Sequence, residues 1–211
     1  MFINREEAGK RLALLILKEK ELKNTVIIAI PRGGVVIGRV VSDILEIPLE
    51  VLIVKKIPAP NNPELAIGAT GSDGVVFWDG DIVKSLRLTK KDKENALLST
   101  QEVIKAREKN LGLKLPDVYR KKILLVDDGV ATGSTVAAAS LILKKLGSQK
   151  IILAVPVIAK RTKGRLSKYF DKIMALEIPY DFSAVGQFYR EFPQVDDEEV
   201  SELLRSSRIN K

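Results

Sequence analysis

The sequence predicts an α/β protein with a mostly parallel, twisted β-sheet, helices on both faces of the sheet and a small C-terminal hood. Short, continuous apolar runs rich in β-branched residues recur along the chain, as is typical of strands buried on both faces. Capped helical segments alternate with these runs, which favours right-handed crossovers into a single sheet. We expect one domain over residues 1–211, with a core over about 24–177, a hood over about 178–195 and a terminal helix ending near 206.

Local signals set the expected elements in order. Asn4 and Glu7 have the spacing of a capping box, so a first helix is predicted to reach about Lys23. Residues 57–63 contain three prolines and are predicted to be loop, and residues 66–87 to hold a hairpin. The remaining expected elements are strands over 25–30, 49–54, 123–126, 151–157 and 172–176, and helices over 35–45, 89–110, 134–146, 160–168 and 196–205.

Composition excludes several classes of chemistry. Hydrophobic residues make up 45% of the chain and charged residues 29%, which argues against intrinsic disorder. The chain contains neither cysteine nor histidine, so thiol nucleophiles, disulfides, cysteine-based metal sites and histidine bases are all excluded. Carboxylates, Lys, Arg, hydroxyls, backbone amides and an oxygen-preferring metal ion remain, and phosphate chemistry is the most prominent activity within that set.

The net charge of +8 is spread evenly along the chain, without a basic arm or an acidic tail. Between Lys160 and Lys168 the chain carries five basic residues and no acidic one, which we interpret as a solvated helix face rather than an RNA or polyphosphate patch. Nucleic acid is therefore not an expected partner.

The early apolar run from Leu12 to Leu17 is far shorter than the ~20 residues that a membrane span needs, and no small-residue cleavage site follows it. We therefore expect a cytoplasmic protein without a membrane partner. The charge-rich, cysteine-free composition favours a thermophilic source.

The strongest motif runs from Ile123 to Thr135. An apolar strand delivers two adjacent carboxylates, Asp127 and Asp128, to its carboxyl end, and small residues then lead into a helix start. Exposed amides, hydroxyls and the positive end of the helix dipole suit an anion there, whereas the carboxylates suit vicinal hydroxyls. The loop is thus complementary to a ribose 5-phosphate. A plain strand–turn–helix is the alternative interpretation, and no Walker-type phosphate loop occurs in the chain.

This string resembles the phosphoribosyl pyrophosphate (PRPP) motif of the type I phosphoribosyltransferases. A closer likeness is to an uncharacterised microbial branch of that family, through Pro-Arg-Gly-Gly at 31–34, Asn-Pro-Glu-Leu-Ala-Ile-Gly-Ala at 62–69, the motif at 126–135 and Ala-Val-Gly-x-x-Tyr at 184–189. The resemblance covers roughly residues 25–205 and implies the fold of that family.

The resemblance also implies roles for individual residues. Asp127 and Asp128 would hold the ribose hydroxyls and contact Mg²⁺ indirectly, since the metal is carried mainly by PRPP. Pyrophosphate would bind at a loop with a cis non-proline peptide, formed by Arg32, Gly33 and Gly34. Lys55, Lys56 and Arg32 would be catalytic, with the two lysines opening a mobile loop. The 5-phosphate would be held by Gly129, Val130, Ala131, Thr132, Gly133, Ser134 and Thr135.

The activity implied is Mg²⁺-dependent transfer of a 5-phosphoribosyl group from PRPP to a nitrogen nucleophile, with release of pyrophosphate. Homodimers are common in the family, so a homodimer is expected. Relatives that act on 6-oxopurines carry an acid where this chain has Ala131, which makes such an acceptor less expected. The resemblance does not name the acceptor.

Aromatic residues concentrate near the C-terminus, where five of the eleven fall between Tyr180 and Phe192. Some are expected in the core, and others could form a hood that stacks on the acceptor base. The hood residues predicted to face the base are Val157, Phe182, Phe188 and Tyr189.

Two other functions remain open. A PRPP-sensing regulator could use the same pocket to control nucleic-acid binding, although the even charge and the lack of a recognisable DNA-binding extension count against it. A plain phosphosugar-binding or hydrolytic module would release ribose 5-phosphate without any base.

Overall fold

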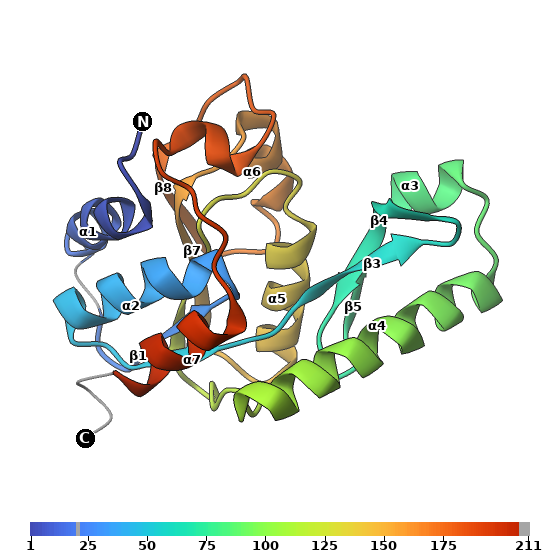
Figure 1. The fold of residues 1–211 in the computed structure, drawn as a ribbon, viewed down its shortest axis with the longest axis horizontal. Helices are drawn as coiled ribbons and strands as arrows, with labels where there is room; N and C mark the ends of the chain where they lie inside the picture. Colours follow the sequence, from blue (N-terminus) through green and yellow to red (C-terminus); the bar gives the residue numbers. More distant parts are fainter. Residues whose placement is uncertain (20–21, 207–211) are drawn as a thin grey trace.

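The computed structural model describes residues 1–19 and 22–206. Its centre is a five-stranded sheet in the order β2-β1-β6-β7-β8 (Figure 1). Every neighbouring pair in this sheet is parallel, as the sequence predicts. The strands are β1 (Thr25–Ala29), β2 (Leu49–Val51), β6 (Lys122–Val126), β7 (Lys150–Val157) and β8 (Lys172–Glu177).

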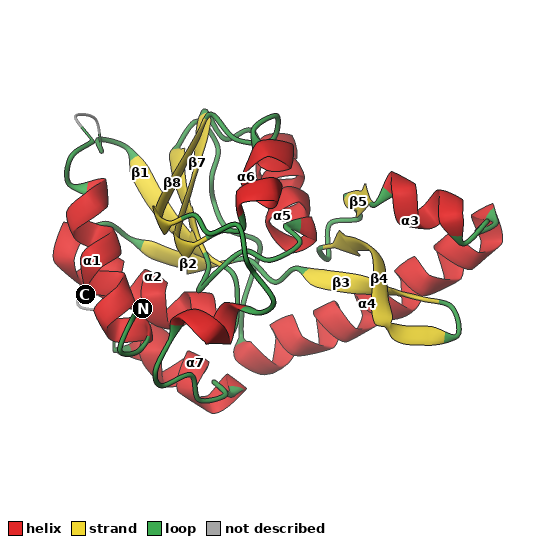
Figure 2. Ribbon diagram, turned by 90° about the horizontal axis from the view of Figure 1, so that it is seen from above, coloured by secondary structure: helices red, strands yellow, loops and turns green. Residues whose placement is uncertain are grey.

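Helices cover both faces of the sheet, which confirms the predicted layer arrangement (Figure 2). Three helices lie over one face: α1 (Arg5–Ile16), α2 (Gly33–Leu45) and α7 (Asp197–Arg205). Two lie over the other: α5 (Ser134–Lys145) and α6 (Lys160–Leu166).

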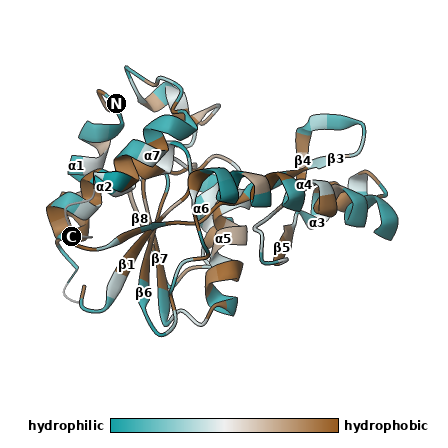
Figure 3. Ribbon diagram, turned by 60° about the horizontal axis from the view of Figure 1, so that its bottom comes forward, coloured by the Kyte–Doolittle hydropathy of each residue, from teal (hydrophilic) through white to brown (hydrophobic). Residues whose placement is uncertain are grey.

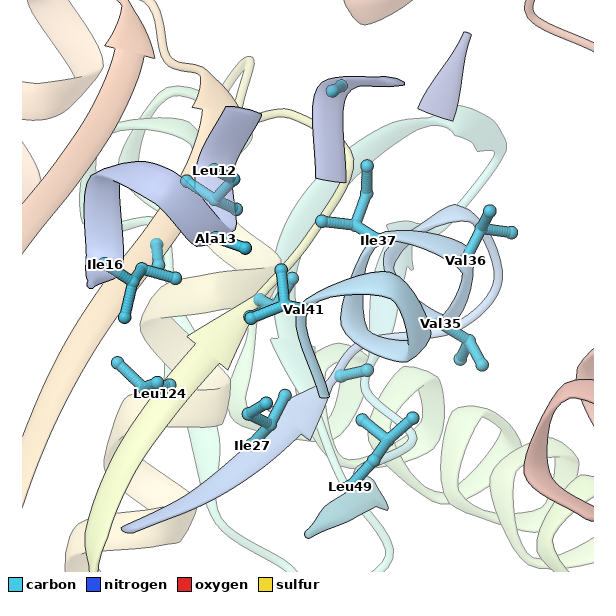
Figure 4. Close-up of a cluster of buried hydrophobic side chains, with 14 of the residues drawn as sticks. Leu12, Ala13, Ile16, Ile27, Val35, Val36, Ile37, Val41, Leu49 and Leu124 are labelled. Carbon is cyan, nitrogen blue, oxygen red and sulfur yellow. The ribbon is translucent and has the colours of Figure 1, made fainter. Parts of the chain in front are cut away.

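Alternation along the strands divides the apolar core between these two faces. Ile27 of β1 and Leu124 of β6 pack with the helices α1 and α2, where Leu12 and Val41 meet them (Figure 4). The next residues along each strand face α5 instead. Because both faces are buried, the strands read as continuous apolar runs in the sequence, which is why they are predictable.

The chain after β2 forms an arm that projects from the core beside α5 (Figures 1 and 3). A small antiparallel sheet in the order β3-β4-β5 packs in it against a long helix, around a separate apolar cluster centred on Ile57 and Ile67. The arm consists of β3 (Lys55–Ala59), β4 (Asn62–Thr70), β5 (Val76–Trp78), α3 (Gly80–Ser85) and α4 (Lys90–Leu111). The helix α4 begins at the predicted cap Thr89 and ends at Gly112.

The prediction of a proline-rich loop over 57–63 is wrong, because this segment forms the hairpin of β3 and β4. Pro58 lies on β3, which is an edge strand, and the register shifts on both sides of it. An edge strand with a bulge tolerates proline because the missing N–H is not needed by a second neighbour. Asn61 closes the turn with a φ of 66°. The predicted hairpin over 66–87 is confirmed in its first half, where the end of β4 pairs antiparallel with β5, and the helix α3 follows it.

The first helix is also shorter than predicted, since α1 ends at Ile16 rather than near Lys23. Its buried positions recur at helical spacing up to Ile16, and exposed or half-buried residues follow. Without an apolar stripe to bury, the charged continuation gains nothing from remaining helical.

The hood, residues 178–195, is largely irregular and contains one 3₁₀ turn, η1 (Val185–Phe188). The N-terminus holds it in place, because the N–H of Phe2 donates to the carbonyl of Phe188 (2.7 Å) and Arg190 N–H donates to the carbonyl of Phe2 (2.9 Å). Phe2 is fully buried against Tyr189. The hood therefore lies beside the start of α1. Among the described residues, no helix is long and apolar enough to cross a membrane.

Replacing Leu124 with alanine tests the importance of the central strand. The side chain is fully buried between β1 and β7, so Leu124→Ala is expected to lower the free energy of unfolding by about 3 kcal/mol. Leu98→Ala on the exposed face of α4 removes the same atoms from a side chain that is 60% exposed, and should change stability by less than about 0.5 kcal/mol. Urea unfolding of both variants measures the difference. Equal losses would contradict this account of the core.

Candidate functional site

The loop after β6 is fixed by hydrogen bonds at its middle, and it ends in the unpartnered amides at the start of α5. Val130 N–H donates to the carbonyl of Val157 (2.9 Å), and Ala159 N–H donates to the carbonyl of Val130 (3.1 Å). Gly133 then takes a φ of +81° as the N-cap of α5, a conformation that favours glycine. The first amides of α5 follow directly, and their N–H groups have no partner within the helix.

Two side chains of α6 bind this loop from outside. Thr162 Oγ1 donates to the carbonyl of Ala131 (2.5 Å), and Arg165 Nη2 donates to the carbonyl of Thr132 (2.9 Å). The carbonyls of Ala131 and Thr132 are thus engaged by α6, and the amide N–H groups of the loop beyond Val130 remain available to bind an anion. Arg165 belongs to the basic run 160–168, so this segment does more than present a solvated face.

A cavity of about 200 Å³ lies against the loop. It brings together most of the predicted 5-phosphate residues with Asp127 and Lys56. Ser134 is buried and does not line it, whereas Thr135 does. The lining residues are Lys56, Asp127, Gly129, Val130, Ala131, Thr132, Gly133, Thr135, Val136 and Val185.

The acidic pair is enclosed by the fold. Asp128 N–H donates to Asp127 Oδ1 (2.9 Å), and Arg5 Nε donates to Asp128 Oδ2 (2.8 Å). The hydroxyl of Tyr189 donates to the backbone carbonyl of Asp128 (2.6 Å). Within the described chain, one oxygen of each carboxylate, Asp127 Oδ2 and Asp128 Oδ1, has no hydrogen-bond donor.

Burial raises the pKa of both carboxyl groups, because it penalises the charged form. The negative charge of Asp128 raises the pKa of Asp127 further, and the Asp128 N–H together with the charges of Arg5 and Lys56 opposes this shift. For Asp128, the main opposing influence is the Arg5 guanidinium. Burial also raises the pKa of the Tyr189 hydroxyl, which therefore remains a hydrogen-bond donor at neutral pH.

The loop after β1 lies directly against the acidic pair. The Pro31–Arg32 peptide is cis, as the family resemblance leads one to expect. A Cβ atom at Gly33 would lie 1.8 Å from Asp128 Oδ2, and one at Gly34 would lie 3.0 Å from the Cα of Asp127. Glycine is therefore required at both positions because the loop after β1 approaches the loop after β6 so closely. The helix α2 begins at the first of them, Gly33.

A second cavity, of about 470 Å³, opens between this loop and the hood. Arg32, Gly33 and the two acidic residues are among its lining, and Val185 borders both cavities. Its full lining is Arg5, Pro31, Arg32, Gly33, Asp127, Asp128, Val185, Phe192, Pro193, Gln194 and Val195.

The two predicted catalytic lysines have different positions. Both are exposed at the start of β3, but Lys56 lines the cavity beside Asp127 and Lys55 does not. Neighbouring residues of a strand point to opposite faces, so one strand cannot present both side chains to the same site. The predicted mobile loop is here a paired strand.

The residues predicted to face a base also lie apart from the cavities. Val157 is fully buried beneath Gly129, and Tyr189 is 5% exposed in the wall behind Asp128. Phe182 and Phe188 pack on each other, with ring centroids 5.0 Å apart. Among the described residues, the hood lines the cavities through Val185 and Phe192–Val195.

Sequence reasoning missed Arg5, Thr162 and Arg165. A usable signal existed for Arg5, because a cation is unfavourable in the first turn of a helix unless a partner compensates it. No local signal marked the other two, since their contacts depend on where α6 packs against the loop.

Comparison with known proteins agrees with this geometry. The profile of the phosphoribosyl transferase domain matches residues 3–192. The chain belongs to the phosphoribosyl transferase family. It is 36% identical over 208 residues to Rv0571c of Mycobacterium tuberculosis, whose name assigns it provisionally as a phosphoribosyl transferase. That match covers 97% of this chain and 46% of the relative, so the chain spans about half the length of the curated relatives it matches.

Two solved structures extend the comparison. TT1426 from Thermus thermophilus is 32% identical, with a TM-score of 0.81 over 96% of this chain and 97% of that one. A purine phosphoribosyltransferase from Pyrococcus horikoshii is 22% identical, with a TM-score of 0.50 over 90% and 93% of the two chains. The latter likeness concerns the fold alone. The phosphoribosyl transferase fold expected from the sequence is thereby confirmed.

Replacing Asp127 with asparagine should stabilise the protein without ligand, and more so at higher pH. Because the folded state raises the pKa of Asp127 above its ordinary value of 3.8, the native protein binds the proton more tightly than the unfolded chain. The contribution of Asp127 to the free energy of unfolding therefore falls as the pH rises from 3.8 towards the pKa of Asp127 in the folded state. Asp127→Asn removes this loss.

We expect a gain of about 1 kcal/mol at pH 8 and a smaller gain at pH 4.5, measured by urea unfolding at both values. Asp43→Asn on α2, where the carboxylate is 42% exposed and paired with Arg39, provides a control without such a gain. A gain independent of pH would contradict the raised pKa of Asp127, which comes first from burial and then from the charge of Asp128.

Proposed function

We propose that this protein transfers a 5-phosphoribosyl group from PRPP to a nitrogen nucleophile in a Mg²⁺-dependent reaction that releases pyrophosphate. The single observation that carries the proposal is the adjacency of three unlike surfaces. A loop rich in free amides, a carboxylate pair with two unengaged oxygens and an arginine-bearing loop meet at the ends of β6 and β1. These surfaces complement the phosphate, hydroxyls and pyrophosphate of one ligand.

In this proposal the ligand spans both cavities. The 5-phosphate accepts hydrogen bonds from the amides of 131–135 and from the hydroxyls of Thr132 and Thr135, since the Val130 N–H is already bonded to Val157. The ribose hydroxyls donate to Asp127 and Asp128. Arg32 and the amides at the start of α2 bind the pyrophosphate.

The chemistry requires no protein nucleophile. The bond between C1 and the pyrophosphate oxygen breaks, with its electron pair leaving on the pyrophosphate, and the lone pair of the acceptor nitrogen forms the new bond to C1. The protein holds both partners in line and neutralises the charge that develops on the leaving group. Arg32 supplies part of that positive charge, and Lys56 lies beside the ribose. Val185 borders both cavities and excludes water from the reacting carbon.

The donor set fits a Mg²⁺ ion that arrives with its ligand. Asp127 and Asp128 are hard oxygen ligands, and each keeps one carboxylate oxygen without a hydrogen-bond donor among the described residues, which suits such an ion. The described residues form no cluster of three or more metal-binding side chains, so PRPP and water would complete the coordination. When bound, the ion neutralises negative charge on the pyrophosphate.

The acceptor would enter from the hood side, where Phe192 and Val195 offer apolar surface and Gln194 an amide. Ala131 offers no acid to a 6-oxopurine, so we favour other nitrogen bases as acceptors. We further propose that the protein works as a homodimer in the cytoplasm.

Calorimetric titration with PRPP and MgCl₂ tests the proposal. We expect micromolar binding that depends on Mg²⁺ and is at least tenfold weaker in Asp128→Asn, which loses a charge-assisted acceptor. Absence of binding to the folded protein would overturn the proposed function. Binding without pyrophosphate release for any base tested would favour the regulatory alternative, and ribose 5-phosphate release without a base would favour a hydrolase.

Arg32→Ala tests the division of the ligand between the two cavities. The variant should bind PRPP and pyrophosphate at least tenfold more weakly and bind ribose 5-phosphate as the unaltered protein does, because only the diphosphate would contact this side chain. Arg161→Ala, an exposed arginine at the start of α6, is the matched control. Equal losses for all three ligands would contradict the assignment of Arg32 to pyrophosphate.

A further inference from the structure

Arg5 joins three parts of the chain at the acidic pair. Its side chain is 9% exposed, although it lies in the first turn of α1. Nε donates to Asp128 Oδ2 (2.8 Å), and Nη1 donates to the carbonyl of Pro193 (2.8 Å). The guanidinium carbon lies 3.7 Å from the ring centroid of Phe192. One planar group thus holds a carboxylate of the PRPP motif, a backbone carbonyl of the hood and an aromatic ring of the hood.

Helix formation does not account for an arginine at this position. The positive end of the helix dipole disfavours a cation in the first turn, and burying a cation costs free energy unless it is paired. Asn4 and Glu7 already cap α1, with Asn4 Oδ1 accepting from Glu7 N–H (2.9 Å). The compensation for Arg5 comes instead from Asp128, which is 123 positions away.

The proposed pyrophosphate loop also packs onto this ion pair. A Cβ atom at Gly33 would lie 2.7 Å from Arg5 Nε as well as 1.8 Å from Asp128 Oδ2. The φ of Gly33 is not positive, so the residue is needed for space and not for a left-handed turn. Arg5 therefore contacts or adjoins every segment that borders the larger cavity: the loop after β1, the acidic pair and the hood.

We propose that Arg5 is a positioning residue that couples occupancy of the ribose site to the position of the hood. By binding Oδ2, it orients Asp128 and leaves Oδ1 for the sugar. Through Pro193 and Phe192 the same guanidinium holds the irregular segment of the hood that borders the acceptor side of the cavity. This inference rests on the proposed function, because it assumes a ribose at the acidic pair.

Arginine suits this task better than lysine. A planar guanidinium donates in fixed directions to two acceptors and stacks through its face on an aromatic ring at the same time. A lysine ammonium could pair with Asp128 but offers no flat face. Arg5→Lys should therefore keep the ion pair with Asp128 but lose the coupling between ribose binding and the hood.

The test compares Arg5→Met with Arg11→Met. Arg11 lies on the same helix, pairs with Glu7 (3.6 Å) and lies over Phe2 (4.8 Å), but it is 43% exposed and lines neither cavity. Affinities for PRPP, ribose 5-phosphate and pyrophosphate, each with MgCl₂, are measured by calorimetry. Hydrogen exchange of residues 185–195, with and without ribose 5-phosphate, measures the hood directly.

We expect the unaltered protein and Arg11→Met to protect the hood when ribose 5-phosphate binds. Arg5→Met should bind PRPP and ribose 5-phosphate at least tenfold more weakly, retain its affinity for pyrophosphate and lose the protection of the hood at saturating ligand. Arg5→Lys should regain most of the affinity without the protection. Phe192→Leu, which leaves the Asp128 pair and the Pro193 hydrogen bond intact, should lose part of the protection and change affinity for ribose 5-phosphate less than threefold.

Protection of the hood in Arg5→Lys and Phe192→Leu equal to that of the unaltered protein would overturn the coupling, even if Arg5→Met did not fold. Unchanged sugar affinity in a folded Arg5→Met would overturn the positioning of Asp128. If the unaltered protein bound no PRPP, the proposed function would fail and the inference with it, whereas PRPP binding insensitive to Arg5 would leave the proposed function in place.

Discussion

The constraint on which this structure depends is the burial of two adjacent carboxylates at the end of a central strand. Asp127 and Asp128 repel each other, and burial opposes the ionisation of both. The fold limits this cost with positive groups from separate elements: Arg5 from α1 and Lys56 from β3. The groups that offset the charge of the pair thus come from the N-terminal helix and the arm as well as from the core.

Close approach of backbone segments is the second feature of the site. Gly33 and Gly34 bring the loop after β1 onto the acidic pair, and Gly129 brings the loop after β6 onto the hood, where a Cβ would lie 2.5 Å from Val185 Cγ1. These three glycines provide space, whereas Gly133 provides a left-handed conformation. Two loops and the hood can therefore contact a single small ligand without a deep cleft.

Much of the fold was predictable because its signals are local. The strands around 25–30, 123–126 and 151–157 are buried on both faces and therefore read as continuous apolar runs. The hairpin of β3 and β4 was not predictable by the same rules. Pro58 argues against a strand unless the strand lies at an edge, and the edge position is known only once the sheet is assembled.

The sequence by itself determined the central chemistry of the candidate site, because a strand end, two carboxylates, small residues and a helix start follow one another within thirteen residues, Ile123 to Thr135. Only the tertiary structure decided which side chains surround that motif. It placed Lys56 rather than Lys55 beside Asp127, buried Tyr189 behind Asp128 and brought Arg5 to the ion pair. The physical reason is that these contacts join residues far apart in the chain, so packing of the elements decides them and local backbone preference does not.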